Sequence, residues 1–216
     1  MTDYDSAKVA ALHRELHNHL PSDPALRVKV LESLLVDKGM IDRKTIDSWV
    51  EVYAEEIGPK RGAHVVAKAW TDPAFKERLM QDAPKAIEEL GYLGVATGHL
   101  HVVENTDDIH NLVVCTLCSC YPFSVLGIAP NWYKTAAYRS RVVRDPRGVL
   151  DEFGVEVSDD VEVRVWDSTA ELRYLVLPQR PSGTDDMNED ELAKLVSRNS
   201  MIGTDRDLSK YINGAG

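Results

Sequence analysis

The sequence has little cysteine, no long apolar run and a shortage of positive charge, and each absence narrows the class of protein. The 216 residues include three cysteines, an odd number, which excludes a framework made only of paired disulfides. No apolar run approaches the roughly 20 residues of a membrane span. The acidic N-terminus lacks the apolar core of a signal peptide, so we expect a cytoplasmic protein. A net charge of −10 disfavours nucleic-acid binding.

All three cysteines fall within six residues, in what we call the cysteine loop (residues 115–120). Cys115, Cys118 and Cys120 have the spacing C-x-x-C-x-C, which lets a short backbone wrap around one ion. Three thiolates suit soft or borderline transition metals, whereas structural zinc and four-iron clusters usually take four protein ligands. The backbone amides of Ser119 and Cys120 would also lie close to a bound ion. The alternative is three buried, reduced cysteines without a metal.

The first ninety residues contain a series of apolar positions at helical spacing, interrupted by proline and glycine. The pattern predicts helices over residues 6–20, 24–38, 44–57, 60–70, 72–81 and 83–91. The connections are short and no aromatic-rich core is evident in this segment. We therefore expect residues 1–95 to form a helical N-terminal arm that clasps a partner.

From His99 the pattern changes to short β-rich runs. It predicts strands over residues 100–103, 112–114, 161–166 and 172–177, with the last two as a hairpin. The cysteine loop directly follows the second run, and loops held by a rigid frame often carry chemistry. Helices are expected over 138–153, which Pro146 divides, and after Asn188. The tail after Gly203 is expected to be frayed.

The pattern therefore predicts an α+β protein. The helical arm is followed by a layered α/β/β/α domain, residues 96–216, with the metal-binding cysteine loop at a strand-to-loop junction.

The sequence of the cysteine loop and of several other segments resembles the alpha subunit of nitrile hydratase. Residues 115–122 read C-T-L-C-S-C-Y-P, which is a highly specific motif. Thr116 is similar to the cobalt type, because iron-type members carry serine there. The resemblance spans about residues 27–204 and includes segments 62–73, 103–107, 138–143, 163–168, 177–181, 195–198 and 200–203.

The resemblance implies a non-corrin Co(III) centre, with iron as the less favoured metal. Cys115 would be an unmodified thiolate ligand, Cys118 a sulfinic acid and Cys120 a sulfenic acid. The deprotonated amides of Ser119 and Cys120 would complete the protein ligands. A beta subunit, in an αβ or α2β2 assembly, would supply arginines to the oxidised cysteines. An activator or metallochaperone is a further expected partner.

The implied reaction is hydration of a small nitrile to an amide. The metal acts as a Lewis acid or activates water, or the sulfenate of Cys120 is the nucleophile. Cys120 and Ser119 are thus catalytic candidates. Asp167 and Arg173 resemble residues that orient the ligands, or they form an ion pair at the end of the hairpin. His110, Tyr121 and Trp132 either line the pocket or pack in the core.

Two other functions fit the same residues. The gamma subunit of thiocyanate hydrolase carries a similar cysteine loop, and a non-catalytic, metal-carrying thiol protein needs only the cysteines. The chain also departs from the family where Phe123 and Ser124 replace a common Trp-Pro pair, and where Asp186 and Met187 replace Gly-Trp. These departures concern the substrate range rather than the metal ligands.

Overall fold

A computed structural model describes residues 23–51, 58–92, 99–118 and 120–212. Contacts divide the chain into two compact units between residues 50 and 51. The expected boundary between 95 and 96 differs from this division. The predicted helix over 6–20 and residue Ser119 lie outside the described residues. Among the described residues, no helix is long and apolar enough to cross a membrane.

The N-terminal unit contains two of the predicted helices, α2 (Asp23–Asp37) and α3 (Arg43–Glu51). Asp42 caps α3 by accepting a hydrogen bond from the backbone N–H of Thr45 at 3.1 Å. An ion pair of 3.0 Å joins Arg43 to Glu32 of α2. Neither helix buries much of its apolar surface, and α3 has no buried residue.

The second unit begins with three helices, α4 (Gly58–Thr71), α5 (Pro73–Gln81) and α6 (Ala83–Glu88). Asp72 and Asp82 each precede a helix with proline in its first turn, and each accepts a backbone N–H three residues on. These helices bury apolar side chains in the same core as the strands. They therefore share one core with the strands.

The four strands in the described part of the chain form two parallel pairs, so the predicted hairpin is wrong. β1 (His99–Glu104) pairs with β4 (Leu172–Leu177), and β2 (Ile109–Val114) pairs with β3 (Glu162–Asp167). The short segments 105–108 and 168–171 each carry the chain from one sheet to the other. The long crossovers that parallel pairing requires are supplied by the intervening helices.

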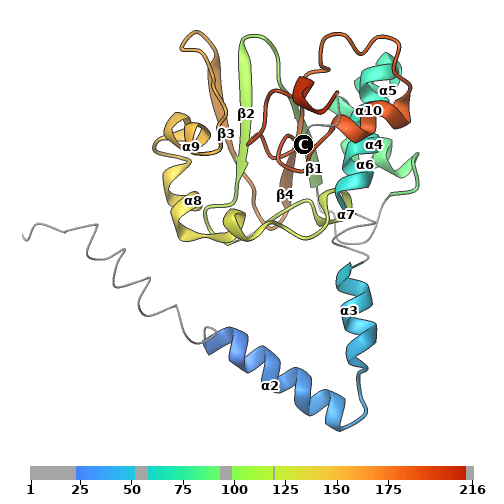
Figure 1. Cartoon of the computed structure of the whole chain (residues 1–216), viewed down its shortest axis with the longest axis vertical. Coiled ribbons are helices and arrows are strands. Elements are labelled where there is room, and N and C mark those ends of the chain that lie inside the picture. Colours follow the sequence, from blue (N-terminus) through green and yellow to red (C-terminus); the bar gives the residue numbers. More distant parts are fainter. Residues whose placement is uncertain (1–22, 52–57, 93–98, 119, 213–216) are drawn as a thin grey trace, which may run out of the picture. The chain divides into compact units, whose positions relative to one another are not determined.

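The two strand pairs contact each other through β2 with β4, β1 with β2 and β3 with β4. α5 and α6 pack on β1, and α10 (Glu189–Leu195) packs on α4. On the other side, α9 (Pro146–Glu152) packs on β3 and contacts α8 (Ala136–Arg141) (Figure 1). The break at Pro146 and the capping box of Asn188 with Glu191 are both confirmed. The mixed helix and strand content expected for an α+β protein is also confirmed.

Three short elements complete the unit: α7 (Phe123–Leu126), η2 (Asn131–Lys134) and η3 (Ser209–Tyr211). α7 lies against α4, where a Cβ added to Gly62 would meet Met201 Sδ and the Val125 carbonyl oxygen at 2.7 Å. Only glycine allows this close approach.

The segment after Gly203 is packed against the fold, so the expected frayed tail is wrong for residues 204–212. Thr204, Asp205 and Leu208 are buried. Gly203 itself has φ +96°, and a Cβ there would collide with the Asn111 carbonyl oxygen. The polar sequence of this segment conceals its burial because its polar side chains are satisfied by hydrogen bonds.

Candidate metal centre

The cysteine loop starts where β2 ends, next to the end of the neighbouring parallel strand. Val114, the last residue of β2, is in register with Asp167, the last residue of β3. The N–H of Ser168 donates to the Val114 carbonyl oxygen at 2.7 Å. Because parallel strands end at one edge of a sheet, this pairing brings residues 115 and 167 together although they are far apart in sequence.

The three cysteine sulfur atoms converge. The Cys118 Sγ lies 3.5 Å from the Cys115 Sγ and 3.1 Å from the Cys120 Sγ. All three atoms lie within 4.8 Å of one another, and they are the only such group of Cys, His, Asp or Glu ligands among the described residues. Cys115 is buried, whereas Cys118 is exposed. One end of the cluster is therefore fixed in the core and the other faces outward.

The chemistry of these donors fits a soft or borderline transition metal. Burial, followed by hydrogen bonds with Cys118 and Cys115, raises the pKa of the Cys120 thiol to about 12. Three sulfurs this close repel one another once ionised, and a cation among them removes that repulsion and favours the thiolate form. The group can therefore hold one metal ion through three sulfur ligands.

The first part of the loop is held by side chains from β3 and α8. Asp167 accepts two hydrogen bonds from Thr116, one from the backbone N–H at 2.9 Å and one from the hydroxyl at 2.6 Å. Arg139 donates to the Thr116 carbonyl oxygen at 3.4 Å. Asp167 thus orients the loop between the first two cysteines.

The last part of the loop is held from η2. The Tyr133 hydroxyl donates to the Cys120 carbonyl oxygen at 2.9 Å. Closer to the first cysteine, the backbone N–H of Cys118 donates to the Cys115 Sγ at 3.3 Å. The sulfur positions are therefore set by hydrogen bonds at both ends of the loop.

A cavity of about 350 Å³ opens beside Cys118 and Cys120. Its volume is in the range of small-molecule sites. Arg173 of β4 lies in its wall. The other lining residues are Tyr121, Phe123, Ile128, Ala129 and Lys134. Two cationic side chains and several apolar ones therefore surround the outward-facing sulfurs.

The remaining candidates from the sequence have different positions. Tyr121 lines the cavity and is also buried. Trp132 packs edge-on against Phe153 and Tyr138, with ring centroids 4.7 and 4.9 Å apart, and is not part of the cavity wall. Trp132 thus packs in the core.

His110 is also a packing residue, but with polar contacts. It is fully buried on β2, and its Nε2 lies 2.7 Å from the Gly203 carbonyl oxygen. Arg206 donates to its Nδ1 at 3.1 Å, so His110 is neutral and carries its proton on Nε2. Burial lowers the pKa of His110 to about 4. This histidine ties the C-terminal segment to β2 and is not a ligand of the cluster.

Sequence reasoning missed Tyr133, Arg139 and Lys134 as neighbours of the cysteine loop. Arg139 falls within the segment 138–143, which resembled the family, so that resemblance was an available signal. No spacing rule connects Tyr133 or Lys134 with the cysteines, because η2 reaches the loop only through tertiary packing.

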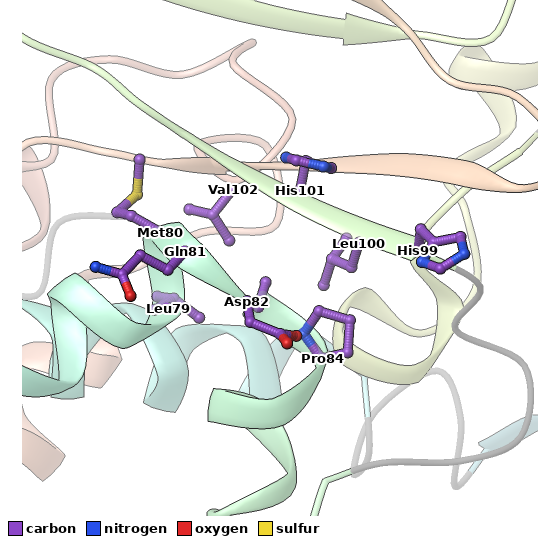
Figure 2. A pocket seen from close by; sticks show the side chains of 10 residues that line it. Leu79, Met80, Gln81, Asp82, Pro84, His99, Leu100, His101 and Val102 are labelled. Atoms are coloured by element: carbon purple, nitrogen blue, oxygen red, sulfur yellow. The ribbon is translucent and has the colours of Figure 1, made fainter.

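A second, smaller cavity of about 200 Å³ lies between the α5–α6 junction and β1. Figure 2 shows Leu79, Met80 and Asp82 beside Leu100 and Val102. His99 and His101 also line it. The Asp82 carboxylate is paired with Lys85 at 2.5 Å, and no group of metal-ligating side chains converges in this cavity. The cysteine cluster is therefore the better candidate site among the described residues.

Three cysteine sulfurs that converge at the end of a parallel strand, next to a small cavity, define a site of the class that holds a metal through thiolate ligands. Comparison with known proteins gives the family. The sequence model of the family described as nitrile hydratase, alpha chain, matches residues 22–205. The chain belongs to this family, whose members are subunits of a multi-subunit hydro-lyase.

The individual relatives agree with this assignment. The chain is 55% identical to the low-molecular weight cobalt-containing nitrile hydratase subunit alpha of Rhodococcus rhodochrous, covering 88% of this chain and 94% of the relative. It is 38% identical to the thiocyanate hydrolase subunit gamma of Thiobacillus thioparus, covering 84% of this chain and 79% of the relative. Its fold matches a double mutant of the Fe-type nitrile hydratase from Comamonas testosteroni Ni1, with a TM-score of 0.77 and 41% identity. The match covers 86% of this chain and 92% of that structure's chain.

Proposed function

We propose that this chain is the cobalt-binding alpha subunit of a nitrile hydratase that converts small nitriles to amides. The observation that carries the proposal is the convergence of three cysteine sulfurs within 4.8 Å in a chain of this family. When bound, the metal supplies Lewis acidity toward the nitrile or toward water. The chain's own residues bind the metal, orient the cysteine loop and position the substrate.

Cobalt, as Co(III), is favoured over iron. The relative with 55% identity is a cobalt-containing enzyme, although an Fe-type enzyme has the same fold at 41% identity. Thr116 in the loop agrees with the cobalt type. The sulfur-rich donor set suits either metal, so the choice depends on the relatives and not on the donor atoms.

The proposed ligands are the sulfurs of Cys115, Cys118 and Cys120 and the backbone amides of Ser119 and Cys120. Three thiolates and two deprotonated amides carry about five negative charges, which a trivalent ion only partly offsets. Arg173 and Lys134 in the cavity wall supply nearby positive charge. Oxidation of Cys118 to the sulfinic acid and of Cys120 to the sulfenic acid is part of the proposal, and the exposed position of Cys118 supports it.

Other residues of the chain prepare the site for substrate. Asp167 holds the loop at Thr116 and so positions the ligands. Arg173 lies where it can interact with the oxidised sulfurs. Phe123 and Ile128 form an apolar wall that suits the hydrocarbon part of a small nitrile.

The proposal includes a beta subunit that completes the site with arginines in an αβ or α2β2 assembly. The exposure of Cys118 and the 82% exposure of Leu117 support a partner surface at the loop. The helical N-terminal arm of residues 1–95 is proposed to clasp this partner, and α2 and α3 within it expose apolar side chains. An activator or metallochaperone, a cytoplasmic location and the α/β/β/α layer order belong to the same proposal.

Thiocyanate hydrolysis is the second candidate. The 38% identity to a thiocyanate hydrolase gamma subunit supports it, and the cysteine motif is compatible with both enzymes. The higher identity to nitrile hydratase alpha subunits favours nitriles.

The experiment that tests the proposal is co-expression of the chain in cobalt medium with the subunit encoded by the adjacent gene, which we call the neighbouring subunit. The purified complex is assayed with acrylonitrile and with thiocyanate. We expect amide formation from acrylonitrile, with little turnover of thiocyanate. A matched Cys118→Ser variant should lose cobalt and activity together. A complex fully loaded with cobalt that hydrates no nitrile would contradict the proposed reaction.

A further inference from the structure

A group of aromatic side chains packs behind the cysteine loop, and Tyr133 is at its centre. Tyr133 is completely buried in η2. Its ring packs edge-on against Tyr121 and Trp132, with centroids 5.2 and 6.0 Å apart, and lies 5.8 Å from the ring of Tyr138. A ring held on several sides has little freedom, so its hydroxyl is fixed in space.

The fixed hydroxyl contacts the loop itself. The Tyr133 hydroxyl donates to the Cys120 carbonyl oxygen at 2.9 Å. A carbonyl oxygen can only accept, so the hydroxyl is the donor in this hydrogen bond. The carbonyl oxygen of Cys120 is therefore held by a donor whose position is fixed by packing.

The geometry points to Tyr133 as a positioning residue of the metal centre: by fixing the Cys120 carbonyl, its hydroxyl sets the backbone orientation at Cys120. This inference rests on the proposed function, in which Cys120 presents both its sulfur and its amide nitrogen to one ion. The χ1 angle relates these two atoms to each other, and the orientation of the Cys120 backbone directs both of them toward the ion. The hydrogen bond to the Cys120 carbonyl oxygen restrains ψ of this residue and therefore that orientation.

Asp167 performs a similar task at the other end of the loop, but with a different part of the backbone. It holds the N–H and hydroxyl of Thr116, four residues before Cys120. Cys120 is only partly buried, and core packing fixes it less than it fixes Cys115. The outward-facing end of the loop thus depends more on a specific hydrogen bond.

Tyr138 offers a matched control in the same aromatic group. Its hydroxyl also donates to a main-chain carbonyl, that of Val113 at 2.7 Å, and it is also buried. However, Val113 lies within β2, and its backbone N–H donates to the Ile202 carbonyl oxygen at 2.9 Å. The strand ladder holds this acceptor whether or not the hydroxyl is present.

The test compares Y133F and Y138F with the wild type in the complex co-expressed with the neighbouring subunit in cobalt medium. Both changes delete one buried hydroxyl and keep the ring. The measurements are cobalt content, the sulfur-to-cobalt charge-transfer absorption per bound cobalt, the number of oxygens on the 115–120 peptide, and kcat and KM for acrylonitrile. The thermal unfolding midpoint is measured in parallel.

For Y133F we expect a shifted charge-transfer band and a kcat lowered about tenfold with little change in KM, because misplacing a reacting group lowers turnover. Y138F should keep the wild-type band and kcat, although its thermal unfolding midpoint falls by about as much as that of Y133F. Such a split cannot arise from general destabilisation.

Three results would overturn the inference. If the wild type loads cobalt and hydrates acrylonitrile, but Y133F has the same band and kcat, Tyr133 does not position the centre and the proposed function stands. A Y133F chain that fails to fold would show that the hydroxyl serves the whole fold. A wild-type complex that takes up no cobalt would remove both the inference and the proposed function.

Discussion

Asp167 shows, at the scale of single residues, how strand pairing assembles the site. The sequence placed it near the end of a strand and offered two roles, ligand orientation or a hairpin-end ion pair. The parallel pairing of β2 and β3 brings it to Thr116, and both carboxylate oxygens accept hydrogen bonds from that residue. The contacts therefore favour orientation of the loop.

Replacing Asp167 with asparagine should lower both cobalt occupancy and kcat/KM by roughly tenfold or more, because supporting residues of metal sites have effects of this size. The amide can accept only one of the two hydrogen bonds that Thr116 donates. Metal analysis and steady-state kinetics on the complex measure the effect. Glu171→Gln, at an exposed carboxylate four residues on, is the control and should behave as wild type. An unchanged D167N enzyme would show that the loop holds its own shape.

His110 illustrates a different residue-scale effect, a buried histidine that must stay neutral. Its pKa is about 4 in the folded chain, against an ordinary value of 6.5. The unfolded chain therefore binds more protons between these values. His110 costs no stability above about pH 6.5, and the penalty grows as the pH falls toward 4.

This penalty should reach about 3 kcal/mol near pH 4. Unfolding midpoints measured between pH 7 and pH 4.5 should fall more steeply for the wild type than for His110→Gln, which cannot take up the proton. The polar groups in contact with His110 are the Arg206 guanidinium, the Asn105 amide and the Gly203 carbonyl oxygen. Parallel pH curves for the two proteins would contradict this account.

At the scale of elements, the positions of helices and strands followed from the sequence, but the strand partners did not. Proline and glycine marked the ends of the helices, and alternation marked β3. A four-residue connection is compatible with a hairpin and equally with a passage between two sheets. The choice depends on which faces are buried in the assembled core, and the local pattern of 161–177 does not contain that information.

The close contact of α4 with α7 predicts that a glycine-to-alanine change in α4 lowers the free energy of unfolding. Glycine-to-alanine changes within helices usually stabilise by roughly 0.5–1 kcal/mol. At Gly62 the added methyl group would meet Met201, Leu126 and the Val125 carbonyl oxygen. Gly62→Ala should instead destabilise by about 1–3 kcal/mol through overpacking.

Thermal unfolding measures this effect, with a decrease of about 2–4 °C expected per kcal/mol. Lys60→Ala, on an exposed position of the same helix, controls for the general effect of a substitution in α4. A raised midpoint for G62A would mean that the two helices have room to separate.

At the scale of the whole molecule, the N-terminal unit exposes apolar surface that a soluble chain normally covers. Val28, Val30 and Leu31 of α2 are each more than half exposed, as is Trp49 of α3. Surface of this kind usually marks an interaction site. It supports the proposal that this unit contacts the partner subunit.

Leu31→Asp should therefore weaken co-purification with the neighbouring subunit at least about tenfold, since a charge would be buried in an apolar contact. The unfolding midpoint of the second unit should not change. Lys29→Asp, on an exposed position of the same helix, is the matched control for added negative charge. Equal recovery of the partner with both variants would place its binding surface elsewhere.

The central claim is that the cysteine loop holds cobalt and is oxidised as in a nitrile hydratase. The most direct measurement is metal analysis of the co-expressed complex together with mass spectrometry of the peptide containing residues 115–120. The account predicts about one cobalt per chain and three added oxygens, two on Cys118 and one on Cys120, or about 48 Da. A loop that carries zinc and three unoxidised cysteines would contradict it.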